Sequence, residues 1–139
     1  MPEITFISKG TTFKLPESRR TSEWLSAIAR SENRKIESLS YVFATDKLVS
    51  SLNVKYLKHN TLTDIITFDF SDAELLIGEV FISIPRVREN ARVFNQPFSR
   101  ELKRVMVHGL LHILGYNDKT ARQSTQMRRK EEACLSLWA

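Results

Sequence analysis

The chain has 139 residues, of which 42% are hydrophobic and 27% are charged, and its net charge is +5. A chain of this length is expected to form a single domain, residues 1–139, with its own hydrophobic core. No stretch approaches the roughly 20 apolar residues of a membrane-spanning helix, and the first residues lack the basic and apolar regions of a signal peptide. Cys134 is the only cysteine, so an internal disulfide is excluded and the cytoplasm is the expected compartment.

In the first half of the chain, strands alternate with helices. Residues 4–7 alternate between apolar and polar side chains and predict a strand. The helix that follows has one apolar stripe, made by Trp24, Leu25, Ile28 and Ala29. A second strand is predicted over residues 36–44, and the next helix begins at Thr45 and Asp46. Its apolar stripe is Leu48, Leu52 and Tyr56. A polar loop is then expected over residues 55–63.

The second half predicts two more strands and three helices. The strands cover residues 64–70 and 75–83, and the later one is apolar on both faces, which is typical of a central strand. Helices are predicted over residues 83–94, with a proline in the first turn, then over the apolar stretch before residue 115, and finally over roughly residues 120–138. The order βαβαββααα predicts an α+β fold, with a small mixed four-stranded sheet flanked by helices.

The most informative stretch is His108-Gly-Leu-Leu-His112-Ile-Leu-Gly115-Tyr-Asn-Asp118. On an α-helix, His108 and His112 lie on one face, about one turn apart. Gly115 is a natural helix stop, and Ser99 is expected to cap the start of this helix. Three residues beyond the stop, the Asp118 carboxylate can return towards the two rings. Two imidazoles and one oxygen ligand, with one position left open, are typical of a catalytic metal site.

The ordinary alternative is that these histidines are hydrogen-bonded core residues. Two histidines on one buried helix would each need a separate buried partner, so the spacing favours the metal site. Gly109 supports this interpretation, because a glycine inside a helix costs roughly 1 kcal/mol relative to alanine. Its presence predicts that something packs closely beside His108.

Basic residues cluster in three places along the second half of the chain. They are Arg86, Arg88 and Arg92; Arg100, Lys103 and Arg104; and Arg122, Arg128, Arg129 and Lys130. Such clusters suggest a polyanionic partner, and solvated helix faces are the alternative interpretation.

The histidine motif resembles the signature of the YbeY family of metal-dependent endoribonucleases. The likeness extends upstream, to Leu52-Asn53, Tyr56, Thr63-Asp64-Ile65-Ile66-Thr67-Phe68 and Gly78-Glu79-Val80-Phe81-Ile82-Ser83. The resemblance implies a small mixed sheet flanked by helices, one zinc ion and hydrolysis of single-stranded RNA. It also implies work on small-subunit ribosomal RNA and ribosome quality control in the bacterial cytoplasm.

Two positions depart from the family pattern. Asp118 stands where the family usually has a third histidine, and metal binding should be preserved because an aspartate oxygen binds zinc at about 2.0–2.2 Å. Leu57 stands where most members have an arginine. We expect Lys58 and His59 to supply the missing cation in catalysis. His59 is the stronger candidate because an imidazolium donates a hydrogen bond and can release a proton, and an ordinary polar loop residue is the alternative.

Three other functions remain open at this point. A zinc metallopeptidase has similar spacing, but it keeps a glutamate directly after the first histidine as general base, and Gly109 occupies that position. Two histidines and a carboxylate also form the facial triad of non-haem iron oxygenases. A ribosome assembly factor with a structural zinc is the third alternative. Zinc held by His108, His112 and Asp118, together with the basic helices, favours the endoribonuclease.

Overall fold

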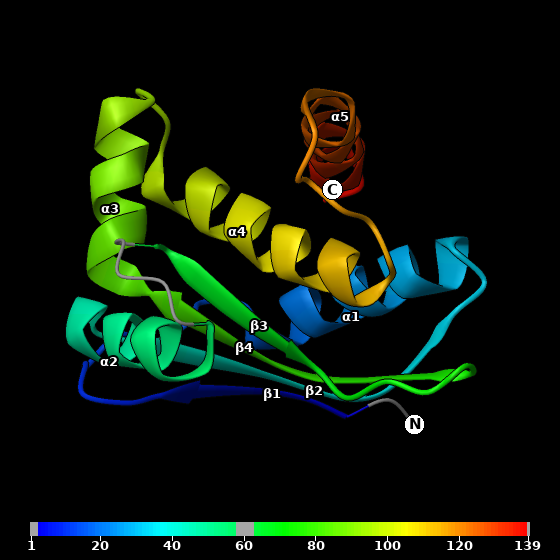
Figure 1. Ribbon diagram of the computed structural model, residues 1–139, viewed down its shortest axis with the longest axis horizontal. Helices are drawn as coiled ribbons and strands as arrows, with labels where there is room; N and C mark the ends of the chain where they lie inside the picture. The colour runs from blue at the N-terminus through cyan, green and yellow to red at the C-terminus, as the bar shows by residue number, and fades with distance from the viewer. Residues whose placement is uncertain (1–2, 58–62, 139) are drawn as a thin grey trace.

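Four strands form one mixed sheet in the part of the chain that this computed structural model describes, residues 3–57 and 63–138 (Figure 1). The strands lie in the order β1-β2-β4-β3. β2 runs parallel to both β1 and β4, whereas β3 pairs antiparallel with β4. Their bounds are β1 Glu3–Ser8, β2 Lys35–Ala44, β3 Ile65–Asp69 and β4 Leu75–Ser83. The prediction that the strand over residues 75–83 is central is therefore confirmed.

Helices cover both faces of the sheet, but unequally. The helices are α1 Ser18–Ser31, α2 Asp46–Leu52, α3 Ile84–Val93, α4 Phe98–Ile113 and α5 Ala121–Ser136, and a π-helical turn, η1 Asn53–Leu57, follows α2. α1 and α4 lie together on one face, and α5 lies on the far side of α4 from the strands (Figure 1). The short helix α2 packs on the opposite face. The predicted α+β fold with a small mixed sheet flanked by helices is confirmed.

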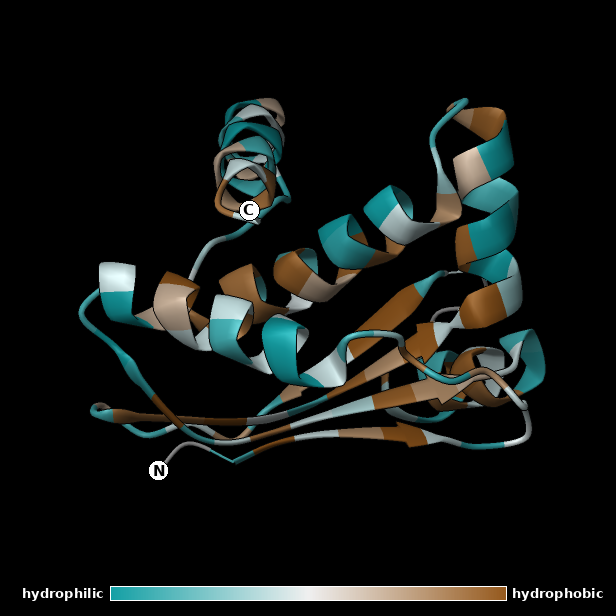
Figure 2. Cartoon of the chain, turned by 180° about the vertical axis from the view of Figure 1, so that it is seen from behind, coloured by the Kyte–Doolittle hydropathy of each residue, from teal (hydrophilic) through white to brown (hydrophobic). Residues whose placement is uncertain are grey.

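Side-chain alternation along β2 and β4 decides which residues meet α1 and α4. The inner side chains are almost inaccessible to solvent; they include Leu39, Tyr41, Phe43, Leu76, Val80 and Ile82. On the other face, Phe81 packs against a smaller cluster that contains Val49 of α2 and Ile66 of β3. Figure 2 shows brown, apolar segments in the strands and a mixture of teal and brown segments in the helices that lie above them. The second face is only half-buried because α2 is too short to cover it.

Two glycines let α4 approach the sheet closely. A Cβ atom at Gly109 would lie 2.9 Å from Cγ1 of Val80 and 3.1 Å from Cδ1 of Ile65. A Cβ atom at Gly78 would lie 2.6 Å from Cδ1 of Ile113 and 2.9 Å from the backbone oxygen of Phe68. The sequence-based prediction that something packs closely at position 109 is confirmed. That neighbour is the sheet itself.

We expect Gly109→Ala to destabilise the protein by about 1 kcal/mol. Overpacking against the stiff Val80 side chain costs about 1–3 kcal/mol, and the better helix propensity of alanine returns up to about 1 kcal/mol. Urea denaturation measures the change, and the double variant Gly109→Ala, Val80→Ala should recover part of the loss attributable to the clash. A more stable Gly109→Ala protein would show that α4 has room to shift.

Helix ends agree with the sequence in most places. The side chains of Thr45, Ser83 and Thr120 accept hydrogen bonds from the first turns of α2, α3 and α5. The expectation for Ser99 is wrong: α4 begins at Phe98, with Pro97 as its N-cap and no side-chain cap. Proline fixes its own φ near −65°, and Pro97, at φ −59° and ψ 143°, directs the chain into the helix before Ser99 is reached.

Candidate metal centre

The structure brings His108, His112 and Asp118 together at the C-terminal end of α4. Gly115 ends this helix with a φ of 109°. The N–H of Gly115 donates to the carbonyl of His112, and the N–H of Tyr116 donates to the carbonyl of Leu111, which is the pattern of a Schellman cap. The chain reverses at this cap, and the Asp118 carboxylate consequently faces the two imidazoles. These are the three candidate ligands that the sequence predicts.

The distances between the three candidate ligand atoms fit one small metal ion. Nε2 of His108 lies 3.0 Å from Nε2 of His112, and Oδ2 of Asp118 lies 3.4 Å from each of them. Zinc ligands in a tetrahedron, at about 2.0–2.1 Å from the ion, are separated from one another by about 3.3 Å. Two nitrogens and one oxygen are also a donor set that zinc accepts. The residues present therefore fit a metal ion bound by three protein ligands.

Glu131 of α5 holds His108 in the orientation that a metal ligand needs. Nδ1 of His108 lies 2.7 Å from Oε2 of Glu131, whose side chain is 5% exposed. With its Nδ1 proton donated to this carboxylate, the imidazole keeps the lone pair of Nε2 free, and such carboxylate–histidine pairs are usual behind metal ligands. Glu131 is not among the site residues predicted from the sequence. The signal was present, because Glu131 falls in the buried stripe of α5 with Met127 and Leu135.

A buried chain of charges extends from Glu131 along α4. Arg104 donates to Glu131 at 3.1 Å and to Glu101 at 3.2 Å, and its own side chain is 15% exposed. Burial raises the pKa of the Glu101 carboxyl, against the opposing charge of Arg104. Arg104 thus bridges two nearly inaccessible carboxylates, and one of them, Glu131, also contacts His108.

The two imidazoles differ in their affinity for a proton. Burial alone would lower the pKa of His108, but the hydrogen bond to Glu131 and the charges of Glu131, Asp118 and Asp64 raise it overall. Burial and the adjacent His108 lower the pKa of His112. A metal ion must displace any proton from the ligating nitrogens, so metal binding at this centre is expected to release protons.

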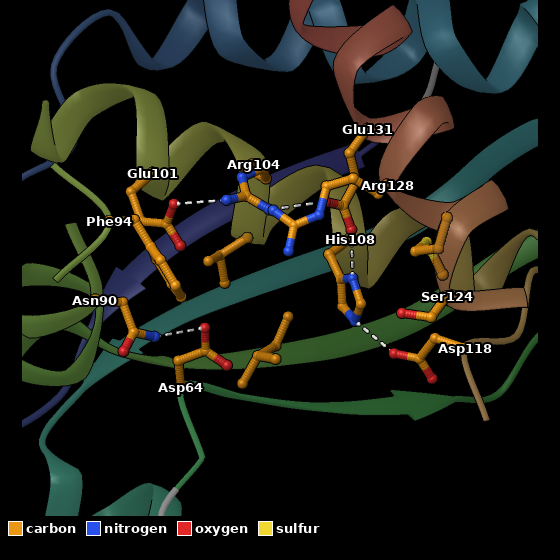
Figure 3. A pocket seen from close by; sticks show the side chains of 13 residues that line it. Asp64, Asn90, Phe94, Glu101, Arg104, His108, Asp118, Ser124, Arg128 and Glu131 are labelled. Carbon is orange, nitrogen blue, oxygen red and sulfur yellow. Dashed lines mark hydrogen bonds and ion pairs between the residues drawn. The ribbon is translucent and has the colours of Figure 1, made fainter. Parts of the chain in front are cut away.

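A pocket of about 300 Å³ opens beside the candidate metal centre (Figure 3). His108 and Asp118 lie on one wall. Asp64 lies on another wall, where it accepts a hydrogen bond from Nδ2 of Asn90 at 3.2 Å. Asp64 directly precedes β3 and Asn90 comes from α3, so the pocket joins the sheet edge to the helices. The candidate metal centre therefore opens onto this pocket through His108 and Asp118.

Burial raises the pKa of Asp64 above its ordinary value of 3.8, and weaker opposing effects come from hydrogen bonds and from the charges of His108 and Arg104. The folded protein therefore holds this proton to a higher pH than the unfolded chain does. The stability that this Asp64 proton contributes is fully present below the pKa that Asp64 has in the unfolded chain. It is lost as the pH rises through the pKa that Asp64 has in the folded protein.

We accordingly expect Asp64→Asn to stabilise the protein at neutral pH, by about 0.5–2 kcal/mol. The asparagine amide oxygen can still accept the hydrogen bond from Asn90. Urea denaturation at several pH values measures the effect, and the difference from the unsubstituted protein should shrink as the pH falls towards 4. A difference that does not change with pH would contradict this account of Asp64.

Comparison with known proteins gives the family. A family model described as endoribonuclease YbeY matches residues 6–139. The chain belongs to the endoribonuclease YbeY family. Endoribonuclease YbeY of Christiangramia forsetii is 43% identical over 136 residues, covering 98% of this chain and 94% of that protein. Endoribonuclease YbeY of Flavobacterium psychrophilum is 44% identical over 126 residues, covering 91% of this chain and 90% of that protein.

A solved structure supports the fold of this YbeY family member. The solution structure of a Thermotoga maritima protein aligns with a TM-score of 0.68 and 25% identity, covering 97% of this chain and 88% of that one. The sequence-based prediction of a YbeY-type enzyme, an endoribonuclease, is thus confirmed at the level of the family. No helix in the described residues is long and apolar enough to cross a membrane.

The predicted catalytic pair stays a prediction from the sequence. Lys58 and His59 lie outside the described residues. Leu57, the residue directly before them, ends η1 with 47% of its surface exposed. Half of the residues in the basic clusters form ion pairs with described residues. These pairs are Arg86 with Asp46, Arg92 with Glu89, Arg100 with Glu132, Arg104 with Glu101 and Glu131, and Lys130 with Glu32.

Proposed function

We propose that this chain is a zinc-dependent endoribonuclease that cleaves single-stranded RNA during maturation of small-subunit ribosomal RNA, and that it serves ribosome quality control in the cytoplasm as one domain. The observation that carries the proposal is the convergence of Nε2 of His108, Nε2 of His112 and Oδ2 of Asp118 within 4.8 Å of one another. Membership of the endoribonuclease YbeY family supports the reaction class.

When bound, the ion would lower the pKa of a coordinated water to about 7 and polarise a phosphoryl oxygen. The chain's own groups have separate tasks. His108, His112 and Asp118 would hold the ion, and Glu131, by accepting a hydrogen bond from Nδ1 of His108, would leave Nε2 free to bind it. Asp118 is an anion at the position where the family usually has a neutral third histidine. Its charge would make a bound metal ion less electrophilic. Lys58 and His59 remain our proposal for the catalytic cations, on the basis of their place after Leu57 in the sequence.

Position 109 argues against a peptidase. A zinc peptidase of similar spacing needs a glutamate there to move a proton. The Cβ direction of residue 109 leads into Val80 and Ile65 of the sheet, so a side chain at this position has no path to the pocket. An iron oxygenase with a facial triad has the same ligand types, and metal analysis separates it from the zinc enzyme.

The test combines metal analysis of the purified protein with cleavage of a labelled single-stranded RNA. We expect about one zinc per chain, cleavage that stops with a chelator and returns with zinc, and little cleavage of double-stranded RNA. Casein serves as the control substrate. Metal-dependent cleavage of casein without cleavage of RNA would support the peptidase, and stoichiometric zinc without either activity would support the assembly factor. Co-sedimentation with small ribosomal subunits tests the ribosomal partner.

A further inference from the structure

Two guanidinium groups line the pocket, and they differ in how they are engaged. Arg104 is clamped between Glu101 and Glu131 and is mostly buried. Arg128 reaches into the pocket from α5, one turn before Glu131 (Figure 3). Its residue is exposed, and within the described residues it forms no ion pair. Among the described residues, Arg128 is therefore the pocket guanidinium that can bind an anion without breaking an ion pair, although its charge also acts on the Glu101 carboxyl.

The charge of the pocket shows why such a cation matters. Four carboxylates line it, those of Asp64, Glu101, Asp118 and Glu131, together with the guanidiniums of Arg104 and Arg128. Their formal charge is 2 − 4 = −2, and a divalent ion would bring it to zero. Without Arg128 the metal-bound pocket would be negative, and it would repel a phosphodiester. Leu57, which stands where the family usually has an arginine, is uncharged and cannot offset this negative charge.

The pocket continues away from the candidate metal centre. A second cavity of about 270 Å³ shares Phe94, Glu101, Arg104 and Arg128 with the first one. The two cavities thus form one groove, and its walls come from the end of α3, from α4 and from α5. Arg128 lies where the cavities meet, so it can contact a chain that enters the first cavity from the second.

Phe94 gives the groove an aromatic surface. It is the C-cap residue of α3, and its ring lines both cavities. Phe94 is 52% exposed and stacks on no other aromatic ring in the described part of the chain. An exposed aromatic ring beside a free cation is the usual platform for single-stranded nucleic acid, because every base has a flat face that can stack.

We propose that Arg128 and Phe94 form a nucleotide subsite next to the metal centre, in which Arg128 binds an RNA phosphate adjacent to the scissile one and Phe94 stacks on its base. This proposal rests on the proposed RNA-cleaving function and specifies how the substrate strand is held. The ligand is an unpaired segment of RNA, since a base in a duplex cannot lay its face on Phe94.

The two contacts make different signatures in RNA binding, measured by fluorescence anisotropy on the zinc-containing protein with a short labelled single-stranded RNA. Arg128→Ala should weaken binding about tenfold, because a charged hydrogen-bonded contact is lost. It should also reduce the slope of log affinity against log salt by about 0.7, the value for one phosphate on a single strand. Arg128→Lys should restore the slope. Phe94→Ala should weaken binding roughly 5- to 100-fold with an unchanged slope, and Phe94→Tyr should restore affinity.

Arg129→Ala is the matched control, because it removes the same charge from the same helix at an exposed position outside both cavities. Zinc content and circular dichroism are checked in each variant. If the unsubstituted protein binds and cleaves RNA but Arg128→Ala and Phe94→Ala behave like Arg129→Ala, the subsite is wrong and the proposed function stands. If the unsubstituted protein neither binds nor cleaves RNA, both proposals are overturned.

Discussion

Asp118→Ala is expected to lower zinc affinity by more than about 100-fold and to abolish metal-dependent RNA cleavage. Changes behind metal ligands already cost about 10- to 100-fold in affinity, and this substitution removes a ligand itself. Oδ2 of Asp118 is 3.4 Å from both imidazole nitrogens, so its loss would leave only the two imidazoles of this group to hold an ion. Competition with a chromophoric chelator measures the affinity.

Two further variants identify the cause of the loss. Asp118→Asn keeps the shape of the side chain but not its charge, and it should also lose zinc. Asn117→Ala changes the neighbouring exposed residue and should keep both zinc and activity. If Asp118→Ala retains stoichiometric zinc with the affinity of the unsubstituted protein, the third ligand is wrongly assigned, and Asn117 becomes the next candidate.

Glu131→Ala is expected to have the second-largest effect, on both stability and metal affinity. It would leave the buried Arg104 with a single partner and an empty space beside His108. Breaking a buried ion pair by removing one partner costs about 3–5 kcal/mol. The loss of the hydrogen bond to Nδ1 of His108 should lower zinc affinity by about 10- to 100-fold. Urea denaturation of the metal-free protein and chelator competition separate the two effects.

Glu131→Gln isolates the role of the carboxylate in orienting the imidazole. Its single amide oxygen can still accept from Arg104, and its amide nitrogen then faces Nδ1 of His108. That contact favours a proton on Nε2, the nitrogen that must bind the metal. We expect a nearly normal fold with weakened zinc binding. Glu132→Ala, which removes an exposed partner of Arg100, is the control. Normal zinc affinity in Glu131→Gln would show that Glu131 only stabilises the fold.

The three candidate metal ligands could be brought together from the sequence because they are close along the chain. Helix geometry relates His108 to His112, and the glycine stop accounts for the return of Asp118. Glu131 is 23 residues from His108, and the two meet only because α5 packs against α4. A glutamate in the apolar stripe of α5 indicates burial, but it does not identify the partner. The contact between Asn90 and Asp64 could not be predicted for the same reason. Asp64 directly precedes β3 and Asn90 lies on α3, so the two meet only in the folded chain.

The strands and helices could likewise be predicted wherever the local sequence pattern agrees with the packing in the folded chain. The apolar pattern of β4 predicted its central place, and Thr45 and Gly115 marked helix ends through their side-chain and backbone chemistry. The prediction that Ser99 caps α4 was wrong. Serine is a common N-cap, but Pro97, two residues earlier, is the N-cap of this helix. The partial cover of β4 by α2 could not be foreseen, because helix length and placement decide how much of a sheet face is buried.

The charge balance of the pocket predicts that binding of the metal ion and binding of RNA strengthen each other. Its ionisable groups sum to −2 before a divalent ion binds and to zero afterwards, so the ion changes the electrostatic potential that a phosphodiester encounters. RNA should therefore bind the metal-bound protein more tightly than the metal-free protein. By reciprocity, RNA must raise the affinity for the ion by the same factor. Substrate would consequently retain the metal in the enzyme when free zinc is scarce.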